Sequence, residues 1–88
     1  MEIMICRPKY TLRAIRYDGT TECVEFIKEH FEGIDLTEVG DQLFFNQSKK
    51  PVLVSTGMIV MEKIFDKLNS KSFSVETEKM FNNLYTVY

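Results

Sequence analysis

Apolar and polar residues alternate near the start of the chain. Between residues 9 and 17, every second position is apolar at first, with Tyr10, Leu12 and Ala14 on one side of the pattern. A period of two places these side chains on one face of a β-strand. We expect the strand to stop at Asp18-Gly19, because glycine accepts a positive φ and aspartate bonds to nearby backbone amides.

A helical spacing follows this turn. Apolar side chains and one histidine recur at intervals of three and four residues, at Cys23, Phe26, Ile27, His30 and Phe31. The spacing predicts an amphipathic helix over about residues 21–32, with this face packed inward. Either Thr20 or Thr21 suits the N-cap, and Gly33 suits the position just past the helix.

The rest of the sequence predicts short strands joined by turns. Strands are expected at Ile34–Val39, Gln42–Gln47, Pro51–Ser55, Met58–Ile64 and Ser72–Val75, with a hairpin turn at Gly40-Asp41 and a polar loop over residues 66–71. Thr77 is expected to cap a short helix over about residues 76–84 that turns Met80, Phe81 and Leu84 inward. Tyr85–Tyr88 is expected to be extended.

These elements predict an α+β fold. Because the connections after the first helix are of hairpin length, we expect a mainly antiparallel sheet of about five strands. The main helix (about 21–32) packs on one face, and the short C-terminal helix (about 76–84) completes the fold. The 88 residues, 44% of them hydrophobic, suit one domain over 1–88. Residues 1–8 either join it or form a loose N-terminal extension.

The charge balance bears on nucleic-acid binding. The chain has 11 basic and 13 acidic residues, a formal net charge of −2. Duplex binders usually carry a basic patch, and counterion release supplies much of their affinity. Duplex nucleic acid is therefore not an expected partner. A local basic group formed by Arg7, Lys9, Arg13 and Arg16 leaves weak binding of single-stranded nucleic acid as an alternative.

The sequence offers few groups for catalysis or metal binding. It has one histidine, His30, and two cysteines, Cys6 and Cys23, without a CxxC spacing. Cys23 and His30 would lie about 10 Å apart on the predicted helix, too far for proton transfer. We therefore expect no enzymatic activity, no metal and no cofactor. Whether Cys6 and Cys23 pair is left open.

Hydrophobic segments are short throughout. The apolar N-terminal stretch ends at Arg7-Pro8, whereas a membrane-spanning helix needs about 20 residues and a signal peptide needs a longer apolar region. The sequence predicts a cytoplasmic protein that does not enter a membrane.

Aromatic and methionine residues are the candidates for an interaction surface. The seven phenylalanines and four tyrosines mainly supply a small core. Phe44 and Phe45 are adjacent, however, so on a strand they face opposite sides, and one is expected to be exposed or covered by another subunit. Met58 and Met61 raise the same question on their strand. With Tyr85, these residues form the predicted surface for a protein partner or a homodimer.

Four short motifs follow one another along the chain: Tyr17-Asp18-Gly19-Thr20, Glu25-Phe26, Gly57-Met58-Ile59-Val60, and Phe81 followed by Tyr85. Together they resemble a family of small phage and prophage proteins. The resemblance that they carry spans about residues 10–88. This chain has Thr56, Met58 and Ile59 where the family usually has Pro, Asp and Trp, so a ligand near Gly57–Val60 is left open. The resemblance implies a phage-encoded protein made in a bacterial host, without an established activity.

These observations favour a non-enzymatic protein that binds a bacterial host protein as an inhibitor or adaptor, for example against a host defence. A self-associating virion or assembly component is the first alternative, and a weak binder of single-stranded nucleic acid is the second. Asp18, Gly19 and Gly57 are interpreted as residues of structural turns.

Overall fold

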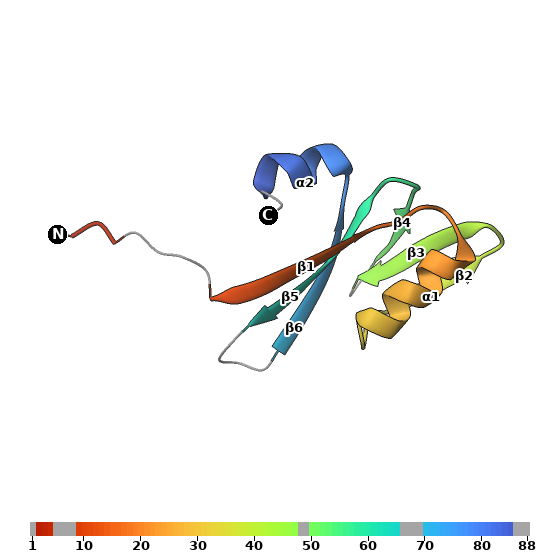
Figure 1. Cartoon of the computed structure of the whole chain (residues 1–88), viewed down its shortest axis with the longest axis horizontal. Helices are drawn as coiled ribbons and strands as arrows, with labels where there is room; N and C mark the ends of the chain where they lie inside the picture. The colour runs from red at the N-terminus through yellow and green to blue at the C-terminus, as the bar shows by residue number, and fades with distance from the viewer. Residues whose placement is uncertain (1, 5–8, 48–49, 66–69, 86–88) are drawn as a thin grey trace.

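The computed structural model describes residues 2–4, 9–47, 50–65 and 70–85. Six strands and two helices follow one another in this part of the chain (Figure 1): β1 (Tyr10–Arg16), α1 (Thr21–His30), β2 (Leu36–Val39), β3 (Gln42–Gln47), β4 (Lys50–Val54), β5 (Ile59–Phe65), β6 (Ser70–Glu76) and α2 (Glu78–Leu84). The fold is α+β, as the sequence predicts.

The strands form two antiparallel sheets of three, in the orders β1-β5-β6 and β2-β3-β4. The expectation of one sheet of about five strands is therefore wrong. β1 pairs along its whole length with β5, from Tyr10 opposite Phe65 to Arg16 opposite Ile59. Alternation within a strand identifies its two faces, but it carries no information on which distant strand will be its neighbour.

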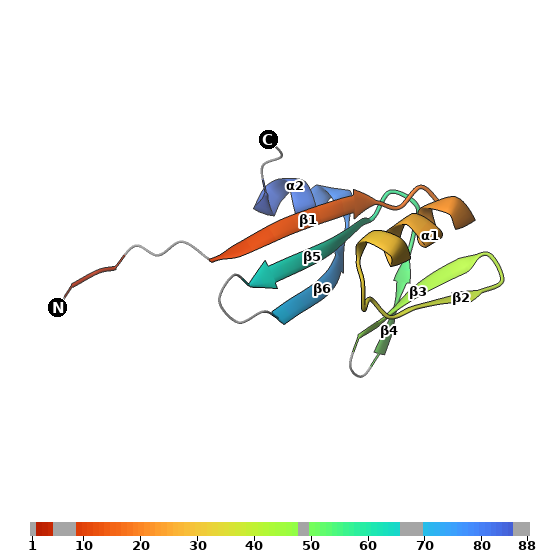
Figure 2. The same cartoon turned by 60° about the horizontal axis from the view of Figure 1, so that its bottom comes forward.

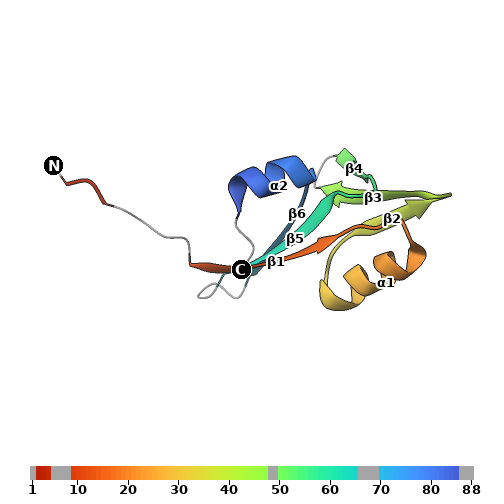
Figure 3. The ribbon, with the colours of Figure 1, turned by 45° about the horizontal axis from the view of Figure 1, so that its top comes forward.

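The central strand β5 is buried on both faces because each face is covered by a helix. Val60 belongs to a core cluster with Val24 and Ile27 of α1. Its neighbours Ile59 and Met61 point the other way and pack with Phe81 of α2. Figure 3 shows α1 and α2 on opposite sides of the β1-β5-β6 sheet. The short C-terminal helix thus has a face of its own to cover.

Helix α1 also packs on the second sheet (Figure 2), where Leu43, Phe45 and Val54 join the same core cluster. Its N-cap is Thr20, whose Oγ1 accepts a 3.1 Å hydrogen bond from the amide of Cys23. The helix ends at His30, two residues earlier than expected. Its buried face differs from the predicted one as well.

The residues of α1 in the core are Val24 and Ile27, followed by Phe31 at the C-cap. Phe26 and His30, which were expected to point inward, lie on the exposed flank of the helix. The physical reason is that both sheets pack against the same face of α1, the face formed by Val24, Ile27 and Phe31. Side chains on the flank of that face, such as Phe26 and His30, stay in solvent. Phe26 and His30 stack on each other instead, with ring centroids 3.9 Å apart.

Several element boundaries also differ from the sequence-based ones. β2 begins at Leu36 instead of Ile34, β6 begins at Ser70 inside the expected polar loop, and α2 begins after its cap Thr77. Phe81 is buried as expected, but Met80 and Leu84 are exposed because α2 turns only one side toward β5. Tyr85 is extended, as predicted.

Residues 1, 5–8, 48–49, 66–69 and 86–88 lie outside the described part of the chain. The expectations about residues 1–8 as a loose extension, Cys6 and most of the 66–71 loop fall largely on these residues. Of the described N-terminal residues, Ile3 and Met4 are exposed. In the ranges that the structure describes, no helix has the length and apolar character needed to span a membrane.

Candidate functional site

The five predicted interaction residues occupy different environments. Phe45 and Met61 are buried in the two core clusters, at 5% and 2% exposure. Met58 packs against the first cluster, and Tyr85 packs against the second, with its ring 5.3 Å from that of Phe81. Phe44 is partly exposed and belongs to neither cluster. Of the five, Phe44 is therefore the one that faces away from the core.

Phe44 lies at the centre of an apolar surface on the β2-β3-β4 sheet. Leu53 on β4 is directly opposite Phe44, and Val39 on β2 is two register positions away, opposite Gln42. Opposed residues of an antiparallel pair share a face, so these side chains point away from α1. Leu53 and Val39 are 44% and 58% exposed. We call Val39, Phe44 and Leu53 the outer patch.

The two turns that the sequence analysis singled out meet in space. The amide of Tyr17 donates to the carbonyl of Met58 at 2.9 Å, and the amide of Gly57 donates to the carbonyl of Tyr17 at 2.8 Å. Gly19 has a φ of 86°, and a Cβ at this position would lie 2.6 Å from Oγ1 of Thr56. A side chain at residue 19 would therefore need a strained φ and would displace the Thr56 hydroxyl, both of which glycine avoids.

A groove runs beside these turns and the hairpin turn at Gly40-Asp41. It consists of two adjoining hollows of about 250 Å³ and 210 Å³ that share Tyr17, Gly19, Asp41 and Gln42. We call it the turn groove. The remaining described lining residues are Thr21, Glu38, Gly40, Leu43, Leu53, Val54, Ser55 and Thr56. Because Leu53 also belongs to the outer patch, the two surfaces are continuous.

The charges on the described lining of the turn groove are both negative. Asp41 lines both hollows, and no hydrogen bond or ion pair joins it to the rest of the described chain. Glu38 lines one hollow and lies 3.9 Å from Nζ of Lys28, at the outer limit of an ion pair. The groove therefore presents one uncompensated carboxylate and one weakly compensated carboxylate to solvent.

Tyr17 is the most deeply buried of the polar side chains that line the groove. It is only 5% exposed, its ring belongs to the first core cluster, and its hydroxyl has no partner within the described residues. Burial raises the pKa of the phenol, and Cys23, Glu38 and Asp18 raise it further. Tyr17 lines both hollows, and its hydroxyl oxygen is not among the fully buried atoms without a partner, so the hydroxyl end of Tyr17 faces the groove. The phenol stays protonated there and retains its full hydrogen-bonding capacity.

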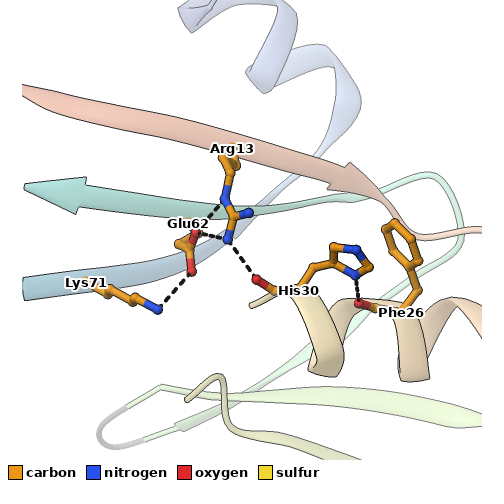
Figure 4. Close-up of polar contacts among 5 residues, drawn as sticks. All are labelled: Arg13, Phe26, His30, Glu62 and Lys71. Atoms are coloured by element: carbon orange, nitrogen blue, oxygen red, sulfur yellow. Dashed lines mark hydrogen bonds and ion pairs between the residues drawn. The ribbon is translucent and has the colours of Figure 1, made fainter. Parts of the chain in front are cut away.

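A second cluster of charges, which the sequence analysis missed, lies beneath the C-terminal end of α1 (Figure 4). Glu62 on β5 is fully buried. Its Oε1 accepts from Nε of Arg13 at 2.8 Å and lies 2.6 Å from Nη2 of the same guanidinium. Nη2 also donates to the carbonyl of His30 at 2.7 Å. The signal in the sequence was a single acidic residue inside the apolar run from Met58 to Ile64.

This cluster links α1 to the sheet. The Arg13 guanidinium lies over the Phe31 ring, 5.4 Å from its centroid, and bonds to a carboxylate and to the last turn of the helix at once. The other carboxylate oxygen, Oε2, has no hydrogen bond and lies 3.8 Å from Nζ of Lys71. Glu62 thus lies between two cationic side chains, which is the arrangement of a structural ion pair.

The two side chains considered for catalysis, His30 and Cys23, each contact a backbone carbonyl. Nδ1 of His30 lies 2.9 Å from the carbonyl of Phe26, and Sγ of Cys23 lies 3.6 Å from the carbonyl of Arg16. The structure does not bring either side chain to the turn groove lining. In the described ranges, no group of three or more His, Cys, Asp or Glu residues is placed to hold a metal ion.

The basic residues proposed for single-stranded nucleic acid are partly compensated. Arg13 is bound to Glu62, and Arg16 forms an ion pair with Glu78 of α2. Lys9 is exposed, and Arg7 lies outside the described residues. Two of the four positive charges are thus already matched within the chain.

A third hollow, of about 550 Å³, opens between the two sheets at the other end of the molecule, where Phe45 and Phe73 form its walls together with Gly33, Asp35, Asn46 and Gln47. Two of its polar side chains, those of Asp35 and Asn46, bond to each other. Nδ2 of Asn46 donates to Asp35 at 3.0 Å and to Thr37 at 2.7 Å. This hollow offers fewer unused polar groups than the turn groove.

No known protein family, characterised protein or solved structure matches this chain.

Proposed function

We propose that this is a small non-enzymatic protein that binds another protein through the outer patch. The observation that carries the proposal is the position of Phe44 and Leu53 on a sheet face that lies away from both core clusters. The solvent-facing side of an antiparallel sheet is normally polar. A group of apolar side chains there is typical of an interaction surface.

The edges of this sheet favour face-on docking over strand addition. β4 carries Pro51, which has no amide to donate to an added strand, and β2 has only four residues. A partner would therefore bury the side chains of Val39, Phe44 and Leu53 instead of pairing with a strand edge.

The resemblance to small phage proteins supplies the biological context of the proposal. A phage protein made in the bacterial cytoplasm is surrounded by host proteins, and binding to the surface of one of them requires no catalytic group. The partner we propose is thus a bacterial host protein, for which this chain acts as an inhibitor or adaptor, for example against a host defence.

The charges around the patch favour a host protein over a second copy of this chain. Asp41 and Glu38 give the turn end of the surface a negative charge. Within the described residues, both arginines of a second copy are already in ion pairs with Glu62 and Glu78. A homodimer would therefore meet this negative edge with lysines, because no described arginine is left unpaired.

The test is affinity capture from bacterial host lysate with tagged wild-type protein, Leu53→Asp and Met80→Asp. Leu53 and Met80 are matched, being 44% and 48% exposed, but Met80 lies on α2 and outside the outer patch. We expect one host protein to be retained in near-stoichiometric amount by the wild type and by Met80→Asp, and lost with Leu53→Asp. Titration of the purified host protein then gives the affinity difference.

Equal retention by all three proteins would contradict the proposal, because binding would not depend on the patch. A concentration-dependent dimer in analytical ultracentrifugation that Leu53→Asp abolishes, with no host protein retained, would replace it with self-association. Patch-independent retention of single-stranded nucleic acid at low salt would favour the remaining alternative.

A further inference from the structure

The turn groove has an unused set of hydrogen-bond acceptors next to the outer patch. Asp41 is unpaired within the described chain and lines both hollows. The Tyr17 side chain is nearly buried, but its hydroxyl has no partner within the described residues, and Glu38 flanks the same hollow. Among the described residues, Glu62 has the one side-chain oxygen that is fully buried without a hydrogen bond, so the Tyr17 hydroxyl is reached from the groove. A ligand in the groove can therefore bond to this hydroxyl without displacing a protein partner.

The negative charge of the groove determines which charge its ligand carries. Its described charged lining residues are both acidic, so an anionic group would be repelled and a cationic group attracted. Asp18 adds a third carboxylate near the Tyr17 phenol. Asp18 is less available than Asp41, because its Oδ1 already accepts from the amide and the hydroxyl of Thr20.

We propose that the turn groove receives the guanidinium group of an arginine that the protein partner presents beside the outer patch. This inference rests on the proposed function and specifies the chemistry of the partner. The apolar and the acidic surfaces share Leu53, so one partner segment can cover both. The arginine enters between the Asp18-Gly19 and Gly40-Asp41 turns, with its nitrogen donors toward Asp41 and the Tyr17 oxygen.

Arginine fits this set of acceptors better than lysine. A guanidinium has five N–H donors in one plane and can bond to a carboxylate and to a second acceptor at the same time. A lysine ammonium is a compact, strongly hydrated charge that loses more hydration on entering a partly buried site. The groove also has apolar walls from Leu43, Leu53 and Val54 for the methylene groups of the side chain.

The two carboxylates of the groove, Glu38 and Asp41, differ in how far a nearby cation compensates their charge. Glu38 has Lys28 at 3.9 Å, whereas no described cation reaches Asp41. Asp41 is therefore the main source of the negative potential, and Tyr17 determines how deep the cation can bind. Removal of the Asp41 charge is expected to weaken binding more than removal of the Tyr17 hydroxyl.

The experiment is a titration of the ¹⁵N-labelled full chain with N-acetyl-L-arginine methylamide, followed by two-dimensional NMR. N-acetyl-L-citrulline methylamide, which has nearly the same shape without the charge, is the control probe. We expect the arginine probe to shift the amides of Gly19, Asp41 and Thr56 with a millimolar dissociation constant. Citrulline should leave them in place. Added salt should weaken binding, because the groove is open to solvent.

Variants test the assignment of the acceptors. Asp41→Asn should weaken binding of the arginine probe about tenfold, as expected for loss of a charge-assisted hydrogen bond, and Tyr17→Phe should weaken it less. Glu29→Gln removes the same charge from the exposed face of α1 and should leave binding unchanged. Asparagine is favourable in a two-residue hairpin turn, so Asp41→Asn is expected to fold.

Equal shifts with citrulline, or unchanged affinity in both Asp41→Asn and Tyr17→Phe, would overturn the inference. These outcomes are separate from the failure of the proposed function. If a host protein binds in a Leu53-dependent way but binds Asp41→Asn as tightly as the wild type, the outer patch is a docking surface and the groove is not its arginine site. If the arginine probe binds and no host protein does, the proposed function fails and the groove remains.

Discussion

The amide of Gly57 donates a 2.8 Å hydrogen bond to the carbonyl oxygen of Tyr17, and thereby joins two turns that are far apart in the sequence. As a result, Gly19 lies directly against Thr56, and the Tyr17 ring beside both turns belongs to the first core cluster. The Asp18-Gly19 turn thus redirects the chain from β1 to α1 and also forms one wall of the turn groove.

Gly19→Ala is expected to destabilise the fold more than Gly33→Ala. The two glycines have similar φ values, 86° and 93°, so each substitution carries a backbone strain of about 1–2 kcal/mol. Only at Gly19 would the new Cβ also meet another side chain, that of Thr56, which adds about 1–3 kcal/mol. Urea unfolding measures both. Gly19→Ala combined with Thr56→Ala should recover the free energy lost to the contact with Thr56. Equal losses of unfolding free energy in Gly19→Ala and Gly33→Ala would contradict this.

Thr20→Ala should cost about 1 kcal/mol of unfolding free energy, because it removes the N-cap bond to the amide of Cys23. Thr21 is the matched control. It is the first residue of α1 and makes no side-chain hydrogen bond within the described chain, so Thr21→Ala should change stability little. Chemical denaturation would refute the assignment if Thr21→Ala were the more damaging substitution.

Asp18 should make stability depend on pH in the acid range. The hydroxyl and amide of Thr20 bond to its carboxylate and lower its pKa below the usual value. A carboxyl with a lower pKa in the folded state stabilises the fold above its unfolded pKa of about 3.9, and this contribution is lost as the pH falls through the folded pKa. Asp18→Asn should flatten this part of the curve of unfolding free energy against pH, whereas Thr20→Ser, which retains the hydroxyl, should preserve it.

Arg13→Met should destabilise the protein far more than Arg16→Met, although both arginines lie on β1. Loss of Arg13 leaves the buried Glu62 carboxylate with only Lys71 at 3.8 Å, at a cost of about 2–3 kcal/mol, less than for a fully buried pair because Arg13 is 46% exposed. Loss of Arg16 breaks an exposed pair with Glu78, worth about 0–1 kcal/mol. Urea unfolding separates these, and Arg13→Met combined with Glu62→Leu should lose less than Arg13→Met alone.

Phe44 and Phe45 should respond in opposite ways. Phe45→Ala removes a core side chain that is 5% exposed and should cost about 3–5 kcal/mol of unfolding free energy. Phe44→Ala lies outside both core clusters and should cost about 1 kcal/mol, while host-protein binding is lost. Unfolding and binding measured on the same two variants provide the check. Equal destabilisation would mean that Phe44 belongs to the core.

The amino-acid sequence by itself determined most of the local structure. The cap at Thr77, a cap at Thr20 or Thr21, the hairpin turn at Gly40-Asp41, and the turns at Gly19 and Gly57 all follow from hydrogen bonding and steric freedom within a few residues. The alternation at Phe44-Phe45 likewise indicated that one ring would face outward, because strand geometry alone requires it.

Only the tertiary structure decided which strands pair, which face of α1 is buried, and which distant side chains and turns come into contact. The sequence pattern could not indicate that β1 pairs with β5, that Phe26 and His30 stay outside the core, or that Glu62 is buried under Arg13. The turn groove also depends on contacts between turns after residues 17, 39 and 55 of the chain. Such contacts form only when the two sheets pack around α1, and the periodicity of apolar residues along the sequence does not predict them.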